Sequence, residues 1–345
     1  MTKGTGEDPA PSAPPPGILP VVSFREALRV WTRVGLLSFG GPAGQIGVMH
    51  RILVEEKRWI SEARFLHALN YCMLLPGPEA QQLATYVGWL LHRVRGGLLA
   101  GTLFVLPGFL SLLALSILYA RFHDLRAVEA FFYGLKPAVL AVVVEAVVRI
   151  GRRALRSGAL WLLAGASFVA IFFLDVPFPL VVAGAGLVGL VGGRLRPSAF
   201  PLPADRSAPG DREAVIDALL ESGALEHTRP SRARTLATVA VWLSLWSVPL
   251  IALHLTLGPD SVFTKEAWFF SRAAVVTFGG AYAVLTFLAQ EAVRTYGWLG
   301  PGQMLDGLGM AETTPGPLIS VVQFVGFRGF SFARRKLSRK IVLNT

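Results

Sequence analysis

The chain has 345 residues, of which 53% are hydrophobic and only 16% are charged. An average soluble domain carries about a quarter charged residues, so this composition argues against a water-soluble globular protein. The 36 glycines and 23 prolines fall within apolar runs, which is more typical of membrane helices than of soluble ones. We therefore expect an integral membrane protein.

The formal net charge is +11, and the Lys and Arg residues lie between the apolar runs. This distribution fits the basic cytoplasmic loops of membrane proteins and argues against a nucleic-acid partner. The single Cys72 excludes an intrachain disulfide, and no Cys or His cluster has the spacing of a zinc site. We predict neither a metal nor a cofactor.

Residues 1–23 are rich in proline and lack the basic-then-apolar order of a secretory signal. We expect them to form a disordered cytoplasmic tail, which places the N-terminus in the cytoplasm.

Two apolar segments, 30–48 and 66–91, each carry helix-breaking residues in their middle. The first contains Phe39-Gly40-Gly41-Pro42 and the second contains Pro76-Gly77-Pro78. Backbone groups freed by such breaks cannot face lipid, so each break must be buried in protein or line a hydrated cavity.

Uninterrupted apolar runs follow the broken segments. Residues 96–120 form an uncharged run that, at about 1.5 Å per residue, is long enough to cross the roughly 30 Å hydrocarbon layer. Further spans are expected at 128–148, 158–173, 177–193 and 235–257, of which the two short ones either tilt little or form a helical hairpin. The stretch 195–234, rich in Pro, Ser and charge, is expected to be a cytoplasmic linker.

Both breaks recur at a constant offset of 239 residues. Phe39-Gly40-Gly41 returns as Phe278-Gly279-Gly280, and Pro76-Gly77-Pro78 returns as Pro315-Gly316-Pro317. The same offset relates Arg33 to Arg272, Trp59 to Trp298 and Leu69 to Leu308 without a gap. The equal spacing indicates an internal duplication.

The distribution of basic residues predicts how the two copies are oriented. The stretches 92–95, 149–156 and 194–234 hold two, four and seven Lys and Arg residues and should be cytoplasmic. Five crossings then separate the loop at residue 92 from the start of the second copy, and this odd number makes the repeats inverted. The basic stretch 51–64 stays inside if both broken segments are re-entrant, which we prefer to full crossing.

The sequence resembles the chromate ion transporter (ChrA) family over about residues 24–329. The resemblance is carried by Ser38-Phe39-Gly40-Gly41-Pro42, by Leu74 to Ala84 (LLPGPEAQQLA), by Leu106-Pro107-Gly108-Phe109, by Thr277-Phe278-Gly279-Gly280 and by Ala311 to Pro317 (AETTPGP). It implies a bacterial inner-membrane protein that exports chromate, a tetrahedral dianion like sulfate. Uptake of sulfate or other oxyanions is a less supported family role.

The breaks are the candidate substrate site. The start of a half-helix offers free N–H groups and partial positive charge to an anion, and four breaks in two inverted copies can converge near the midplane. The alternative is that Gly and Pro only permit close packing or kinks. The candidate residues are Phe39, Gly40, Gly41, Pro76, Gly77, Pro78, Glu79, Gln82, Phe278, Gly279, Gly280, Glu312, Thr313, Thr314, Pro315, Gly316, Pro317, Arg33 and Arg272.

Several of these residues allow two interpretations. Glu79 either couples protons to export or only caps the helix after Pro78. Arg33 and Arg272 either draw a dianion toward the breaks or extend to the membrane surface. Gln82 either donates to oxyanion oxygens or bonds between helices, and the hydroxyls of Thr313 and Thr314 are further donors.

We thus expect an all-α membrane protein, an inverted-repeat bundle with broken or re-entrant helices. The first repeat covers 24–194 and an incomplete second repeat covers 235–329. Residues 330–345 are basic, lack an apolar run and look like an aberrant tail; a homodimer is one way to supply missing helices.

The functional hypothesis is a secondary carrier that exports chromate, driven by ion exchange or membrane potential. The sequence contains no nucleotide-binding P-loop, which disfavours ATP-driven pumping. The rival hypotheses are an exchanger of sulfate or another oxyanion, a non-functional fragment, and a membrane-embedded enzyme that uses Glu79, Asp306 and Glu312.

Overall fold

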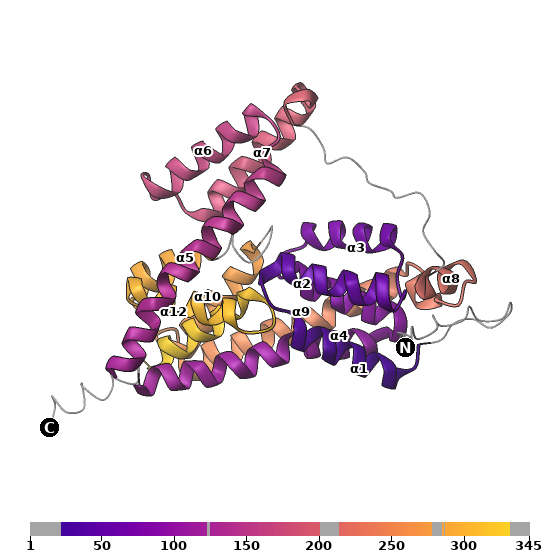
Figure 1. Cartoon of the computed structure of the whole chain (residues 1–345), viewed down its shortest axis with the longest axis horizontal. Coiled ribbons are helices and arrows are strands. Elements are labelled where there is room, and N and C mark those ends of the chain that lie inside the picture. The colour runs from indigo at the N-terminus through magenta and orange to yellow at the C-terminus, as the bar shows by residue number, and fades with distance from the viewer. Residues whose placement is uncertain (1–21, 123–124, 201–213, 278–284, 286, 332–345) are drawn as a thin grey trace, which may run out of the picture.

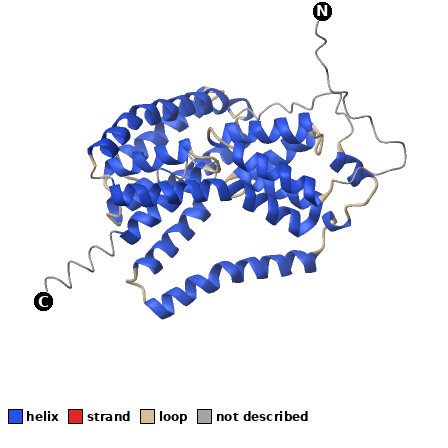
Figure 2. Ribbon diagram, turned by 60° about the horizontal axis from the view of Figure 1, so that its bottom comes forward, coloured by secondary structure: helices blue, strands red, loops and turns tan. Residues whose placement is uncertain are grey.

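The computed structural model describes the chain except for residues 1–21, 123–124, 201–213, 278–284, 286 and 332–345. The described residues form helices joined by loops and contain no strand (Figure 2), so the expected all-α class is confirmed for them. Residues 24–91 lie toward one end of the long axis, and residues 126–154 and 301–313 lie toward the other (Figure 1).

The first predicted break separates two helices. Helix α1 (Phe24–Leu37) begins at Ser23, whose hydroxyl accepts a hydrogen bond from the Glu26 amide, and ends before Gly40. Gly40 has a φ of 80°, a conformation that favours glycine, and α2 (Gly41–His50) starts directly after it. A π-helical turn, η1 (Arg51–Glu56), continues α2.

The chain turns back at this first break. Lys57, which follows η1, lies 2.9 Å from the Glu26 carboxylate near the start of α1. The ring centroids of Trp31 and Trp59 are 6.2 Å apart. The two ends of the first broken segment therefore lie close together.

The second predicted break lies between α3 (Glu62–Leu74) and α4 (Glu79–Phe122). Helix α4 is itself a hairpin, because His92 and Arg93 have non-helical backbone angles. A Cβ on Gly88 would lie 2.4 Å from the Gly96 oxygen, so the two arms pack closely there. The first arm, residues 79–91, is called the half-helix below; the second arm contains the expected span 96–120.

The remaining spans of the first half are present as helices: α5 (Arg126–Ala154), α6 (Gly158–Phe172) and α7 (Phe178–Leu195). Helices α6 and α7 lie side by side as a hairpin (Figure 1), one of the two expected arrangements. The linker is followed by α9 (Arg232–Leu257). Within the described residues, α4 and α9 are long and apolar enough to cross a membrane, and shorter apolar helices occur at Gly158–Phe172, Leu180–Leu195 and Leu318–Ser331.

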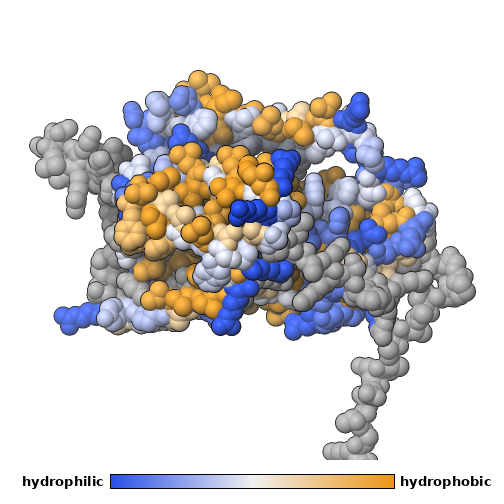
Figure 3. Space-filling view, turned by 90° about the horizontal axis from the view of Figure 1, so that it is seen from above, coloured by the Kyte–Doolittle hydropathy of each residue, from blue (hydrophilic) through white to orange (hydrophobic). Residues whose placement is uncertain are grey.

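Apolar side chains cover much of the surface seen in Figure 3. Residues such as Leu162 on α6, Leu195 on α7 and Leu255 on α9 expose about three quarters of their surface. Such broad apolar exposure suits lipid as the surrounding solvent.

The described elements of the second repeat follow the same order as their counterparts in the first. It comprises α10 (Val262–Val276), the π-helical turn η4 (Gln290–Thr295), α12 (Pro301–Thr313) and η5 (Leu318–Ser320), which continues as the helix Leu318–Ser331. The bounds of η4 and α12 equal those of η1 and α3 at the offset of 239 residues. The Trp59 amide donates to the Leu53 oxygen at 2.8 Å, and the matched Trp298 amide donates to the Ala292 oxygen at 2.9 Å.

Each repeat has its own hydrophobic core. The first core includes the fully buried Trp31 and Phe65, and the second includes Phe269 and Phe324. Leu112 and Tyr119, near the end of α4, belong to the second core. Because Ala100 and Phe104 of the same arm belong to the first core, the second arm of α4 contributes to both cores.

Two expected boundaries look different in the structure. Val22 and Ser23, placed in the tail by the sequence, pack on the first repeat, where His92 bonds to the Val22 oxygen. Part of the expected linker forms helix α8 (Val215–Glu221) against the first repeat. Residues 332–345, most of the expected aberrant tail, lie outside the described residues.

Candidate functional site at the helix breaks

Two hydrogen bonds join the breaks of one repeat to those of the other. The Gly77 amide donates to the Thr277 oxygen at 2.8 Å, and the Gly316 amide donates to the Ser38 oxygen at 2.8 Å. At the offset of 239 residues, Gly77 matches Gly316 and Ser38 matches Thr277. The same contact is thus made twice with the repeats exchanged, which is the pattern that a twofold axis produces.

The glycines of the Pro-Gly-Pro motifs adopt conformations that few other residues tolerate. Gly77 has a φ of 123° and Gly316 a φ of 97°. These angles end the preceding helix and aim the amide at the other repeat. Because both amides are already bonded to carbonyl oxygens, the amide donors for an anion are those in the first turn of each following helix, which lack an intrahelical partner.

The break of the second repeat is also held by the first repeat's α2 and α4. The Gln45 side chain donates to the Gly316 oxygen at 2.5 Å, and Gln45 is buried. A Cβ on Gly108 would lie only 2.2 Å from the Pro315 oxygen. This close approach explains why the Leu106-Pro107-Gly108-Phe109 motif has a glycine at position 108, where a larger residue would collide with Pro315.

Glu79 is the first residue of the half-helix, directly after the break, and is 8% exposed. The Gln82 side-chain nitrogen donates to the Pro76 oxygen at 2.8 Å. In this arrangement one N–H of the Gln82 side chain stabilises the break, and its buried amide oxygen, which has no hydrogen-bond partner among the described residues, cannot donate to an anion.

Hydroxyl groups beside the breaks bond back to their own helices. Ser38 donates to the Val34 oxygen and the matched Thr277 to the Ala273 oxygen, both at 2.6 Å. Thr313 donates to the Gly309 oxygen at 2.9 Å, and Thr314 to the Ala311 oxygen at 3.2 Å. These four hydroxyls still have lone pairs but have committed their protons, so they act first as caps on the last helical turns.

The other candidates have different surroundings. Phe39 is 46% exposed at the end of α1, and Glu312 lies in the last turn of α12, before the break rather than after it. Phe278, Gly279 and Gly280 lie outside the described residues.

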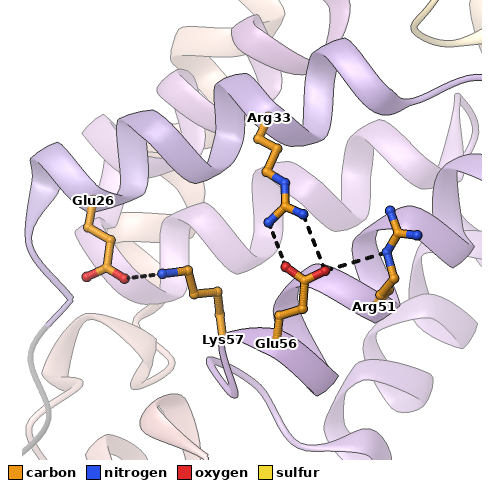
Figure 4. A network of polar contacts seen from close by, with 5 residues as sticks. All are labelled: Glu26, Arg33, Arg51, Glu56 and Lys57. Atoms are coloured by element: carbon orange, nitrogen blue, oxygen red, sulfur yellow. Dashed lines mark hydrogen bonds and ion pairs between the residues drawn. The ribbon is translucent and has the colours of Figure 1, made fainter. Parts of the chain in front are cut away.

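Arg33 takes part in a network of ion pairs on α1 and η1 (Figure 4). Its guanidinium contacts both Glu56 carboxylate oxygens, at 2.6 and 3.4 Å, and Arg51 lies 3.6 Å from the same carboxylate. Arg272 is exposed on α10, and the residue matched to Glu56 is Thr295, which cannot form this pair. The two arginines therefore have unequal environments.

The sequence patterns did not predict three residues that hold the site together, which are Ser38, Gln45 and Thr277. Ser38 and Thr277 stand in the quoted motifs at matched positions, so the offset could have identified them. Nothing in the local sequence marks Gln45, whose partner is 271 residues away.

Comparison with known proteins gives a consistent result. A family model described as "Chromate transporter" matches residues 25–190 and 264–336. The chain is 35% identical over 313 residues to a chromate transport protein of Pseudomonas aeruginosa, covering 89% of this chain and 67% of that protein. It is 29% identical to a chromate transport protein of Cupriavidus metallidurans, covering 89% of this chain and 68% of that protein.

A probable chromate transport protein of Synechococcus elongatus is also 29% identical, with 89% of this chain and 70% of that protein covered. No solved structure matches. The second matched segment runs to residue 336. The resemblance expected over about residues 24–329 is therefore confirmed in two segments, the second of which ends slightly beyond the expected limit.

Proposed function

Because the chain belongs to the chromate transporter family, we propose that it is a secondary transporter that exports chromate across the bacterial inner membrane. Ion exchange or the membrane potential drives the export. The substrate is proposed from the relatives named for chromate transport and from the suitability of the breaks for a dianion.

We propose further that the two repeats are inverted, which the packing along the second arm of α4 supports. Near the middle of this arm, Gly108 lies against Pro315. Toward the α4 hairpin, Gly96 lies against Gly88 of the half-helix. Toward the other end, the Tyr119 hydroxyl donates to the Asp306 carboxylate at 2.9 Å, and its ring lies 5.4 Å from Phe324.

These contacts imply opposite directions for the two helices that follow the Pro-Gly-Pro breaks. The half-helix runs from the middle of the molecule toward the hairpin at His92, and the helix Leu318–Ser331 runs from the middle toward Tyr119. The half-helix lies beside the stretch of the arm from Gly108 to Gly96, and the helix Leu318–Ser331 lies beside the stretch from Gly108 to Tyr119. Each stretch is about 17 Å long. Matched segments that diverge from a shared centre are what an inverted repeat requires.

The chain reversals at the breaks favour re-entrant segments. The first broken segment returns to its start, since Lys57 contacts Glu26. The second broken segment is entered at Ser61 and left at the α4 hairpin. Asp217 and His227, both from the segment between the repeats, bond to Ser61 and to Trp89 beside that hairpin, so the two ends lie near each other. The basic residues 51–64 and 92–95 then share one side, in agreement with the positive-inside rule.

The substrate site we propose lies where the half-helix and the helix Leu318–Ser331 begin. Each start contributes first-turn amides and about half a positive elementary charge, so two starts together suit a dianion. A carboxylate at Glu79 would repel the dianion, so proton uptake by Glu79 would link binding to proton movement. Glu79→Gln, which resembles the protonated acid, should therefore keep chromate exchange but remove its dependence on pH.

One observation carries the proposal: the reciprocal bonds Gly77 to Thr277 and Gly316 to Ser38. We expect Gly77→Val and Gly316→Val each to abolish counterflow of labelled chromate in proteoliposomes while membrane insertion persists. A valine at either position is strained, because φ is positive. Normal counterflow in both variants would remove the breaks from the mechanism.

The same assay separates chromate from the rival substrate. If the proposal is correct, excess sulfate fails to compete with labelled chromate. Equal competition would favour a general exchanger of tetrahedral dianions.

A further inference from the structure

The segment between the repeats is docked on the first repeat rather than free. The Val215 amide donates to the Arg58 oxygen at 3.0 Å, and the Ile216 amide donates to the Trp59 oxygen at 2.9 Å. Ile216 is fully buried, and Ala214 is 3% exposed. Residues 214–229, called the strap below, thus form part of the first core.

Asp217 of the strap holds the start of α3. Its carboxylate accepts a hydrogen bond from the Ser61 amide at 3.0 Å and from the Arg64 guanidinium at 2.6 Å. The amides at a helix start lack intrahelical partners, and a negative charge there is favourable. Asp217 therefore caps α3 from outside that helix.

His227 of the strap holds the end of the half-helix. Its Nε2 lies 3.1 Å from the Trp89 oxygen, and its ring meets the Trp89 ring edge-on at 4.9 Å between centroids. Trp89 lies in the last turn before the α4 hairpin, where carbonyl oxygens lack intrahelical partners. The neutral imidazole satisfies one of these oxygens.

The two helices that the strap grips are those on either side of the Pro76-Gly77-Pro78 break. The second repeat does not carry the same grip: Ser61 is matched by Gly300, and Arg64 by Gln303. The strap thus acts on one repeat only.

We infer that the strap fixes the outer ends of α3 and the half-helix, and so positions the break between them for substrate, with Asp217 and His227 as positioning residues. The docking itself is independent of the proposed function; only its effect on transport rests on that function.

The surroundings of His227 make this grip sensitive to acid. Burial lowers the pKa of His227 from its ordinary 6.5, the hydrogen bond to Trp89 opposes the shift, and the positive Arg93 of α4 and Arg234 of α9 add to the lowering. The docked strap therefore prefers neutral His227. Docking is complete above pH 6.5 and weakens as the pH falls from 6.5 through the lowered pKa.

Cysteine labelling of the full chain in membranes tests the docking. In a Cys72→Ala background, a cysteine at Ala214 reports whether the strap is seated, and one at Leu225, 8% exposed, repeats the readout. We expect both to resist a maleimide at neutral pH. Asp217→Asn should speed labelling about tenfold, the scale of a charge-assisted hydrogen bond. Asp217→Glu should keep protection, as should the control Glu221→Gln on the same helix.

The acid dependence supplies a second arm. Acid slows the reaction of every thiol with a maleimide, so the rate is compared with that of the same variant unfolded at the same pH. This relative rate should rise at about pH 5, and His227→Gln, which cannot become charged, should remove the rise. Fast labelling at neutral pH with Asp217 intact would contradict the docking of the strap. Equal protection in Asp217→Asn would contradict it as well.

Chromate exchange completes the test. In Asp217→Asn we expect a higher half-saturation concentration with a nearly unchanged maximum rate, because the break is less well positioned; Glu221→Gln should match the parent. An unchanged half-saturation concentration would contradict the positioning role. If the parent itself exchanges no chromate, the proposed function fails while labelling still decides whether the strap is docked.

Discussion

At the scale of single residues, small side chains and buried amides decide how closely the repeats approach. Gly108 allows the Pro315 carbonyl to touch α4, and Gln45 satisfies the carbonyl of Gly316. Neither residue offers charge to a substrate. Both act by keeping the two breaks in register.

Substitution of Gly108 tests this approach. Gly108→Ala places a methyl group 2.2 Å from the Pro315 oxygen and should cost roughly 1–3 kcal/mol of packing between the repeats. Chromate exchange should fall sharply. Gly165→Ala in α6, where a Cβ meets nothing within 4 Å, is the matched control and should exchange normally. Equal activity in the two variants would contradict the close contact.

Removal of the Gln45 amide tests the hydrogen bond to Gly316. Gln45→Ala leaves a buried carbonyl without its donor, which costs about 1–3 kcal/mol. We expect a lower melting temperature of the purified protein in detergent. Gln45→Glu keeps the shape but, when ionised, cannot donate, so it should be destabilised as well. A melting temperature unchanged in both variants would show that this bond contributes nothing.

At the scale of elements, the duplication extends to local backbone detail. The π-helical turns η1 and η4 and the helices α3 and α12 keep the same bounds at the common offset. The charges on these elements were not kept, since Glu56 is replaced by Thr295. The backbone of the repeat is therefore shared while its polar contacts differ.

The ion pair of Arg33 gives a test at this scale. Because Glu56 holds Arg33 on α1, we expect Arg33→Gln to leave the half-saturation concentration for chromate within about twofold of the parent and to change stability by less than about 1 kcal/mol. Exchange kinetics and thermal unfolding are the measurements. A large rise in half-saturation would instead support the interpretation that Arg33 draws the dianion toward the break.

At the scale of the whole molecule, the sequence predicted the long apolar helices and the three described breaks, because apolar length and Gly-Pro chemistry are local properties. It could not predict the bonds between Gly77 and Thr277 or between Gly316 and Ser38, which depend on how distant segments meet. The strap was missed for a related reason. Its composition is that of a polar linker, and only the fit of Ile216 and Asp217 to the first repeat distinguishes it.

The central claim is that two matched halves face opposite sides of the membrane around shared breaks. Glu55 and Arg294 are exposed residues at matched positions of the two repeats. Single cysteines at these positions, in a Cys72→Ala background, can be labelled with a membrane-impermeant maleimide in sealed vesicles of known orientation. We predict that one is labelled only in inside-out vesicles and the other only in right-side-out vesicles. Labelling of both from the same side would contradict the account.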